Sequence, residues 1–124
     1  MSKVVHFEIP ADDPERAVSF YQEVLGWESS RFGDVAYWLV QAGEEGEPGA
    51  DGAISARDEI HRAPVVVASV GDIAAALARV SAHGGVILQE QLPIPGMGWS
   101  AYFQDPEGNA VGLFQSDPGA GLGG

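Results

Sequence analysis

The chain has 124 residues, of which 45% are hydrophobic, so it is long enough for one domain with a packed core and its composition is not that of a disordered protein. Its formal net charge of −12 argues against nucleic-acid and anionic-membrane binding, but it allows a cationic ligand. The sequence has no cysteine, no signal-peptide pattern and no apolar run of the roughly 18 residues that span a bilayer, so we expect a cytoplasmic protein without disulfides.

Residues 4–9 are rich in β-forming side chains and predict a first strand, which a helix follows. Asp12 or Asp13 is the expected N-cap, Pro14 suits the first turn, and Gly26 is the expected stop after the helix. Apolar residues recur at helical spacing and predict one buried face, made of Ala17, Phe20, Tyr21, Val24 and Leu25. Further strands are expected at residues 35–40 and 52–56.

A second copy of this order follows, with a strand at residues 64–70 and a helix that starts after Asp72 and ends at Gly84 and Gly85. Strands are expected again at residues 100–105 and 109–115. Repetition of the same order of elements favours two similar modules. We therefore predict an α+β fold of one domain, residues 1–124, with two βαβββ modules that form a cupped mixed sheet around a central cavity, helices outside. The modules are residues 3–56 and 64–115, and the Gly/Pro-rich residues 116–124 form a flexible tail.

The first strand carries two side chains with acid–base chemistry, His6 and Glu8, which lie on the same face if the strand is regular. They are candidate catalytic residues that bind an amine or move a proton, although a packed core histidine and a glutamate at an exposed strand end remain alternatives. His61, in the charged link between modules, and His83, near the end of the second helix, are expected on the surface.

Aromatic residues fall on or beside the predicted strands, where they either pack in the core or form a stacking pocket for a flat or cationic ligand. These candidate ligand-binding residues are Tyr37, Trp38, Trp99, Tyr102 and Phe103. Residues 92–101 are rich in Pro and Gly, and they form either a loop over the cavity mouth or an ordinary strand connector.

The segments "HFEIPADDPERAVSFYQEVLGW" and "YFQDPEGNAVGLFQ" resemble the vicinal oxygen chelate superfamily, which includes glyoxalase I, extradiol dioxygenases and bleomycin-binding proteins. The resemblance covers about residues 3–115. It implies paired βαβββ modules, usually in a homodimer, and in many members a divalent metal in the cup that stabilises an anionic intermediate.

The resemblance also implies where metal ligands would stand in this sequence. The first-strand ligand matches His6, the only metal-ligand candidate, whereas Val65 and Gly112 occupy the expected ligand positions of the second module. The remaining position falls near Leu39–Gln41, where Gln41 is only a weak substitute. Catalytic metal sites generally need about three protein ligands, so we expect no complete metal site, and a divalent metal stays the alternative.

Two functions follow from these residues and from the resemblance. The first is a bleomycin-resistance-like protein that binds a small molecule, cationic or aromatic, in the sheet cavity. The second is a metal-dependent, lactoylglutathione lyase-like or related enzyme of the glyoxalase class that uses His6.

Overall fold

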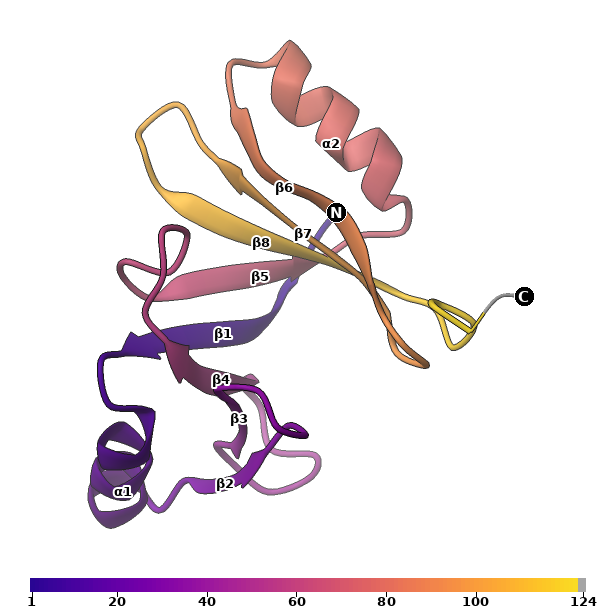
Figure 1. Ribbon diagram of the computed structural model, residues 1–124. Helices are drawn as coiled ribbons and strands as arrows, with labels where there is room; N and C mark the ends of the chain where they lie inside the picture. The colour runs from indigo at the N-terminus through magenta and orange to yellow at the C-terminus, as the bar shows by residue number, and fades with distance from the viewer. Residues whose placement is uncertain (123–124) are drawn as a thin grey trace. The chain divides into compact units, whose positions relative to one another are not determined.

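The computed structural model describes residues 1–122, which form eight strands and two helices (Figure 1). The elements, in chain order, are β1 (Val4–Ala11), α1 (Pro14–Leu25), β2 (Glu28–Arg31), β3 (Tyr37–Gln41), β4 (Asp51–Ala56), β5 (Val65–Ser69), α2 (Ile73–Ala82), β6 (Val86–Ile94), β7 (Gly98–Gln104) and β8 (Ala110–Ser116). The predicted α+β class and the two successive βαβββ modules are confirmed. No helix in this part of the chain is long and apolar enough to cross a membrane.

The chain divides into two compact units that follow the repeat. The first unit is Val5–Val66, and the second unit contains the residues from Val67 on together with Met1–Val4. The N-terminus joins the second unit because the backbone N–H of Ser69 donates to the carbonyl of Lys3 at 2.8 Å.

Each unit pairs its strands in the same way. In the first unit, β1 is parallel to β4, and the antiparallel pairs β4–β3 and β3–β2 follow. In the second unit, β5 is parallel to β8, and the antiparallel pairs β8–β7 and β7–β6 follow. Two parallel neighbouring strands need a long crossover connection. In each module this connection contains the helix and the two middle strands, which lie between the first and last strands in the sequence.

Both helices begin at the predicted caps. Asp13 accepts a hydrogen bond from the backbone N–H of Arg16 at 3.1 Å, and Asp72 accepts one from Ala75 at 3.0 Å. These bonds satisfy amides that have no partner within the helix. Gly26 ends α1 in the left-handed conformation, with a φ of 73°, which glycine adopts without steric cost.

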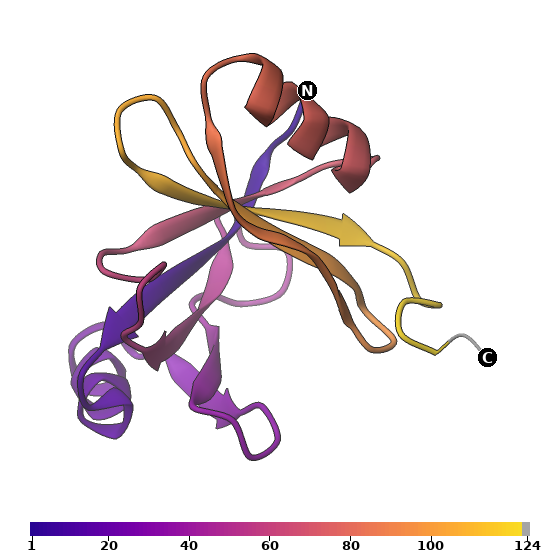
Figure 2. The same cartoon turned by 45° about the horizontal axis from the view of Figure 1, so that its top comes forward.

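Each helix lies along one face of the sheet of its own unit, α1 in the first and α2 in the second (Figures 1 and 2). The core of the first unit joins Ala11, Val40 and Ile54 to Ala17, Val18 and Tyr21 of α1. The core of the second unit joins Ile73, Ala76 and Leu77 of α2 to Ala101 and Leu113.

The predicted buried face of α1 is wrong in part. Ala17 and Tyr21 pack against the core, but Phe20, Val24 and Leu25 are 58%, 58% and 55% exposed. The residues of the helix that pack against the core are Ala17, Val18 and Tyr21.

Residues 92–101 are a strand connector, because β6 and β7 continue through them as a hairpin that pairs Ile94 with Gly98. Part of the predicted tail packs on this hairpin: the backbone N–H of Gly96 donates to the carbonyl of Ala120, which is 1% exposed. The last two residues of that predicted tail lie outside the described residues.

Candidate functional site

Alternation along β1 separates two sets of side chains in the first unit. Ile9 and Ala11 belong to the core under α1, and Phe7 packs on Trp27 with ring centroids 5.3 Å apart. Successive side chains of a strand point to opposite faces, so His6 and Glu8 lie on the face away from α1. The predicted arrangement of these two residues on one face is therefore present.

Glu8 is 3% exposed and accepts a hydrogen bond from the hydroxyl of Tyr37 on β3, with 2.7 Å from the phenol oxygen to Oε2. The same phenol oxygen lies 2.9 Å from Nε2 of His6. Tyr37 therefore joins the two residues of β1, whose Nε2 and Oε2 atoms are 3.7 Å apart. Burying a carboxylate without hydrogen-bond partners is costly, and the contact with Tyr37 reduces this cost for Glu8.

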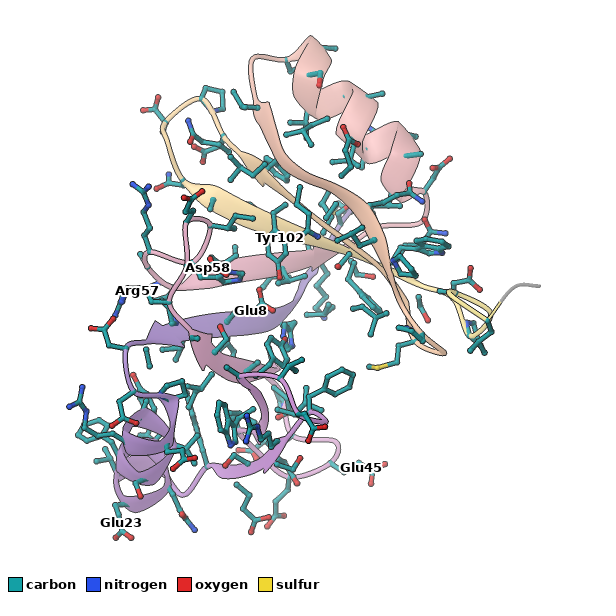
Figure 3. The ribbon with its side chains drawn as sticks, viewed as in Figure 1. Glu8, Glu23, Glu45, Arg57, Asp58 and Tyr102 are labelled. Carbon is teal, nitrogen blue, oxygen red and sulfur yellow. The ribbon has the colours of Figure 1, made fainter. Side chains whose placement is uncertain are left out.

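His61 contacts the other oxygen of Glu8, with 2.7 Å between Nε2 and Oε1. On its far side, Nδ1 of His61 lies 3.1 Å from Oδ1 of Asp58. Asp58 also accepts from the backbone N–H groups of Ile60 and His61, so the link after β4 folds into a tight turn. Figure 3 labels Glu8 on β1 and Asp58 in this link. We call the five residues Asp58, His61, Glu8, Tyr37 and His6 the polar chain.

The neighbours of His61 set its charge. Burial alone would lower its pKa, but the hydrogen bonds and negative charges of Glu8 and Asp58 outweigh burial and raise the pKa above its ordinary value. Burial would raise the pKa of Asp58, but the hydrogen bonds from the backbone and side chain of His61 together outweigh burial and lower this pKa. The polar chain therefore favours a protonated His61 between two carboxylates.

The prediction that His61 lies on the surface is wrong, since its residue is only 8% exposed. Its segment, "RDEIHRAP", has the composition of a solvated link, and this concealed the role of the turn. The sequence held one indication of this role. If Glu8 of β1 is buried, its carboxylate requires a side chain that donates a hydrogen bond to it. His83 is exposed at the end of α2, as predicted.

A hollow of about 430 Å³ opens beside His6 on the sheet of the first unit. It is lined by His6, Glu28, Ser29, Ser30, Leu39, Val40, Gln41, Asp51 and Gly52. This lining includes two carboxylates and neither lysine nor arginine, so it favours a positively charged group.

Ser55 is a second polar feature of the first unit. It pairs with Tyr37 in the β3–β4 register, so the two side chains share one face. Its hydroxyl is buried and has no hydrogen-bond partner among residues 1–122. Such a hydroxyl is a polar contact that a bound molecule or a water can satisfy.

The residues around His6 do not fit a metal ion. Nitrogen and oxygen ligands lie about 2 Å from a bound zinc ion. The position between Nε2 of His6 and Oε2 of Glu8 is taken by the Tyr37 hydroxyl, which bonds to both atoms. Within residues 1–122, no three His, Cys, Asp or Glu side chains gather in a way that could hold a metal. Gln41 lines the hollow, where its side-chain amide donates to the carbonyl of Gly43.

Val65 and Gly112 stand at the two predicted ligand positions of the second module. Val65 is buried at the start of β5. Gly112 lies on β8 opposite Val67 and Tyr102, and a Cβ atom there would come within 2.9 Å of Val67 Cγ2 and 3.1 Å of Tyr102 Cε1. Cross-strand neighbours thus fill the place that a longer side chain would need.

Of the predicted ligand-binding aromatics, Tyr37 lies on the face that carries Glu8. Trp38 lies on the opposite face of β3, where Arg31 sits 5.0 Å from its ring. In the second unit, Trp99 and Phe103 pack against the core under α2, and Tyr102 lies on the other face beside Gly112. Their roles in binding stay predictions.

The comparisons with known proteins agree with this fold. The family model of the Glyoxalase/Bleomycin resistance protein/Dioxygenase superfamily matches residues 3–113. A comparison with curated proteins found no match.

Three solved structures illustrate the likeness. A superfamily member from Vibrio splendidus has a TM-score of 0.66 and 20% identity, over 94% of this chain and 100% of that one. Methylmalonyl-CoA epimerase from Mycobacterium tuberculosis has a TM-score of 0.64 and 19% identity, over 93% and 88%. A Mn(II)-bound glyoxalase from Novosphingobium aromaticivorans has a TM-score of 0.62 and 22% identity, over 98% of this chain and 42% of that one.

Proposed function

The chain belongs to the Glyoxalase/Bleomycin resistance protein/Dioxygenase superfamily, and we propose that it binds a small organic cation, without a metal, in the hollow of its first unit. The observation that carries this proposal is the hollow itself, about 430 Å³ in volume and lined by Glu28, Asp51 and His6. Its size lies within the range of small-molecule sites, roughly 300 to 1,000 Å³.

Charge selects the ligand class. Both carboxylates of the lining belong to exposed residues, so a cation can reach them from solvent. Asp51 is held in place by the backbone N–H of Ala42, which donates to its Oδ1 at 2.8 Å. The apolar side chain of Leu39 offers a contact for the hydrocarbon or aromatic part of the ligand. A small amine or amidine with an apolar body suits this combination.

The metal-dependent lyase is the weaker alternative, because the Tyr37 hydroxyl already bonds to both the imidazole and the carboxylate that a metal would need. We further expect a homodimer in the cytoplasm, as the resemblance and the composition implied. Sedimentation at micromolar concentration tests the dimer.

The test uses the chelator-treated protein and a matched pair of probes, cationic benzamidine and neutral benzamide. Amide chemical shifts are followed in ¹H–¹⁵N spectra during each titration. We expect benzamidine to shift the amides of residues 28–30, 39–41 and 51–52 and to bind more tightly than benzamide. The replacement Glu28→Gln should weaken benzamidine binding up to about 5-fold, since an exposed ion pair contributes at most about 1 kcal/mol.

Glu23→Gln is the control, because Glu23 is an exposed carboxylate on α1 and outside the hollow. It should leave the affinity unchanged. Equal affinity for the two probes, or shifts confined to residues outside the hollow, would contradict the proposal.

A further inference from the structure

Four of the residues that line the hollow form one row across the sheet of the first unit. Glu28 of β2 pairs with Gln41 of β3, and Asp51 of β4 pairs with His6 of β1. The antiparallel register of β3 and β4, continued by one residue, places Gln41 opposite Asp51. The order across the four strands is therefore Glu28, Gln41, Asp51 and His6, and all four line the hollow.

The spacing of this row suits a ligand with two positive charges. Neighbouring strands lie about 4.7–4.9 Å apart, so the backbones at Glu28 and Asp51, two strands apart, are separated by roughly 9–10 Å. The carboxylate of Asp51 is held by the backbone N–H of Ala42 at 2.8 Å, so it cannot move towards Glu28 without losing this bond. A small monocation would pair with one carboxylate and leave the other unpaired, since the lining holds neither lysine nor arginine.

Gln41 supplies an acceptor between the two carboxylates. Its side-chain nitrogen donates to the carbonyl of Gly43 at 3.2 Å, so this end of the amide is occupied. The oxygen Oε1 has no hydrogen-bond partner among residues 1–122 and is able to accept from a ligand. Leu39, in the next row opposite Ser30, offers an apolar contact for the methylene groups between two charges. The row thus presents three acceptors, one strand apart, beside an apolar side chain.

We propose that the hollow binds a linear polyamine, which lies across β2, β3 and β4 with one terminal ammonium group at Glu28 and the other at Asp51. An inner nitrogen donates to Oε1 of Gln41. A three-carbon spacer holds two nitrogens about 5 Å apart when it is extended, which matches the distance between neighbouring strands. This inference rests on the proposed function, because it names the ligand class of the same hollow.

The first experiment compares two ligands of equal length, the dication 1,7-diaminoheptane and the monocation octylamine. Each is titrated into the chelator-treated protein at low ionic strength, and ¹H–¹⁵N spectra report the affinity and the amides that shift. We expect the diamine to bind about 2- to 5-fold more tightly, the gain from a second exposed ion pair, and to shift the amides of residues 28, 41 and 51. Equal affinity, or tighter binding of octylamine, would overturn the proposal.

Variants of the row show which carboxylates carry the advantage of the diamine. Glu28→Gln and Asp51→Asn each remove one charge, and the asparagine keeps an oxygen that can accept from Ala42. In each variant the diamine should bind no more tightly than octylamine. A diamine advantage that persists unchanged in either variant would contradict the proposed position of the ligand.

Glu45→Gln is the matched control for attraction by the overall negative charge. Glu45 is an exposed carboxylate in the loop between β3 and β4, and it does not line the hollow (Figure 3). This variant removes the same charge as Glu28→Gln, yet it should keep the advantage of the diamine over octylamine. An equal loss in Glu45→Gln and Glu28→Gln would assign the effect to diffuse attraction and overturn the proposal.

The inner nitrogen is tested with bis(3-aminopropyl)amine, in which an N–H group replaces the central CH₂ of 1,7-diaminoheptane. We expect it to bind the wild-type protein more tightly than the diamine does. The difference should shrink in Gln41→Met, which has a side chain of similar length without the acceptor oxygen. An unchanged difference in Gln41→Met would overturn the contact between the inner nitrogen and Gln41.

The same spectra separate failure of this inference from failure of the proposed function. If benzamidine and octylamine both leave the amides of the hollow unshifted, the proposed function fails, and this inference fails with it. If both bind in the hollow while the diamine has no advantage, this inference alone fails.

Discussion

The two units repeat one another in register but differ in chemistry. In the first unit Glu8 of β1 lies opposite Ala53 of β4, and in the second Val67 of β5 lies opposite Gly112 of β8. Both pairs keep the same spacing from the cap of their helix, Asp13 or Asp72. The repeat therefore places a buried carboxylate in one unit and a buried valine at the corresponding position of the other.

Both units nevertheless carry a small residue at the facing position, Ala53 on β4 and Gly112 on β8. Ala53 is fully buried beside a strand whose polar residue is held by Tyr37 and His61. Gly112 leaves the space that Val67 and Tyr102 occupy. The comparison teaches that the fold needs only a small residue at this position, whereas the chemistry depends on what the first strand carries opposite it.

Replacing Glu8 by valine would make the first unit like the second, and it should have the largest effect. The Glu8→Val change leaves buried His61 and the Tyr37 hydroxyl without the carboxylate, so the free energy of unfolding should fall by about 3 kcal/mol or more. Urea denaturation measures it. Glu90→Val, at an exposed position of β6, is the matched control and should stay within about 0.5 kcal/mol. A loss below about 1 kcal/mol for Glu8→Val would show that the polar chain contributes little.

Adding one methyl group at Gly112 should have a smaller effect. The new Cβ of Gly112→Ala would come within 2.9 Å of Val67 Cγ2, a buried and stiff side chain, so overpacking should cost about 1–3 kcal/mol. Gly71→Ala is the control, because nothing lies within 4 Å of a Cβ atom there. Equal stability of the two variants would contradict the view that neighbouring side chains require glycine at position 112.

The charge of His61 should make the stability of the first unit depend on pH. Its pKa is raised in the folded state, so folding binds a proton more tightly, and the stabilisation is full below the ordinary value of 6.5. Stability should then fall as pH rises through the folded pKa, by at most about 1.4 kcal/mol per pH unit for one group. His61→Gln should flatten this slope above pH 6.5, whereas His83→Gln should keep it. An unchanged slope in His61→Gln would assign the pH dependence to other groups.

Sequence patterns predicted the framework well because it depends on local chemistry. The caps Asp13 and Asp72, the stop at Gly26 and the order of the strands each follow from neighbouring residues, and all are present. The shared face of His6 and Glu8 also followed from strand alternation alone.

The site beyond β1 depended on contacts between residues distant in sequence. The sequence predicted His61 on the surface, but a turn held by Asp58 buries it. Its hydrogen-bond partner, Glu8, lies in a distant segment of the chain, so the local pattern did not indicate this contact. The apolar stripe of α1 was overestimated for a related reason. Periodicity identifies an apolar helix face, but the sheet determines how much of that face is covered, and Phe20 and Val24 stay exposed.

A metal titration tests most directly whether the polar chain replaces a metal centre in the first unit. The protein is stripped with chelator, and Mn²⁺, Ni²⁺, Zn²⁺ and Fe²⁺ are titrated separately by calorimetry into the wild-type and His6→Ala proteins. We predict no ion bound at one per chain with a Kd below about 1 μM, which corresponds to about −8 kcal/mol. Tight binding of one ion per chain that His6→Ala abolishes would contradict the metal-free site and favour the metal-dependent enzyme.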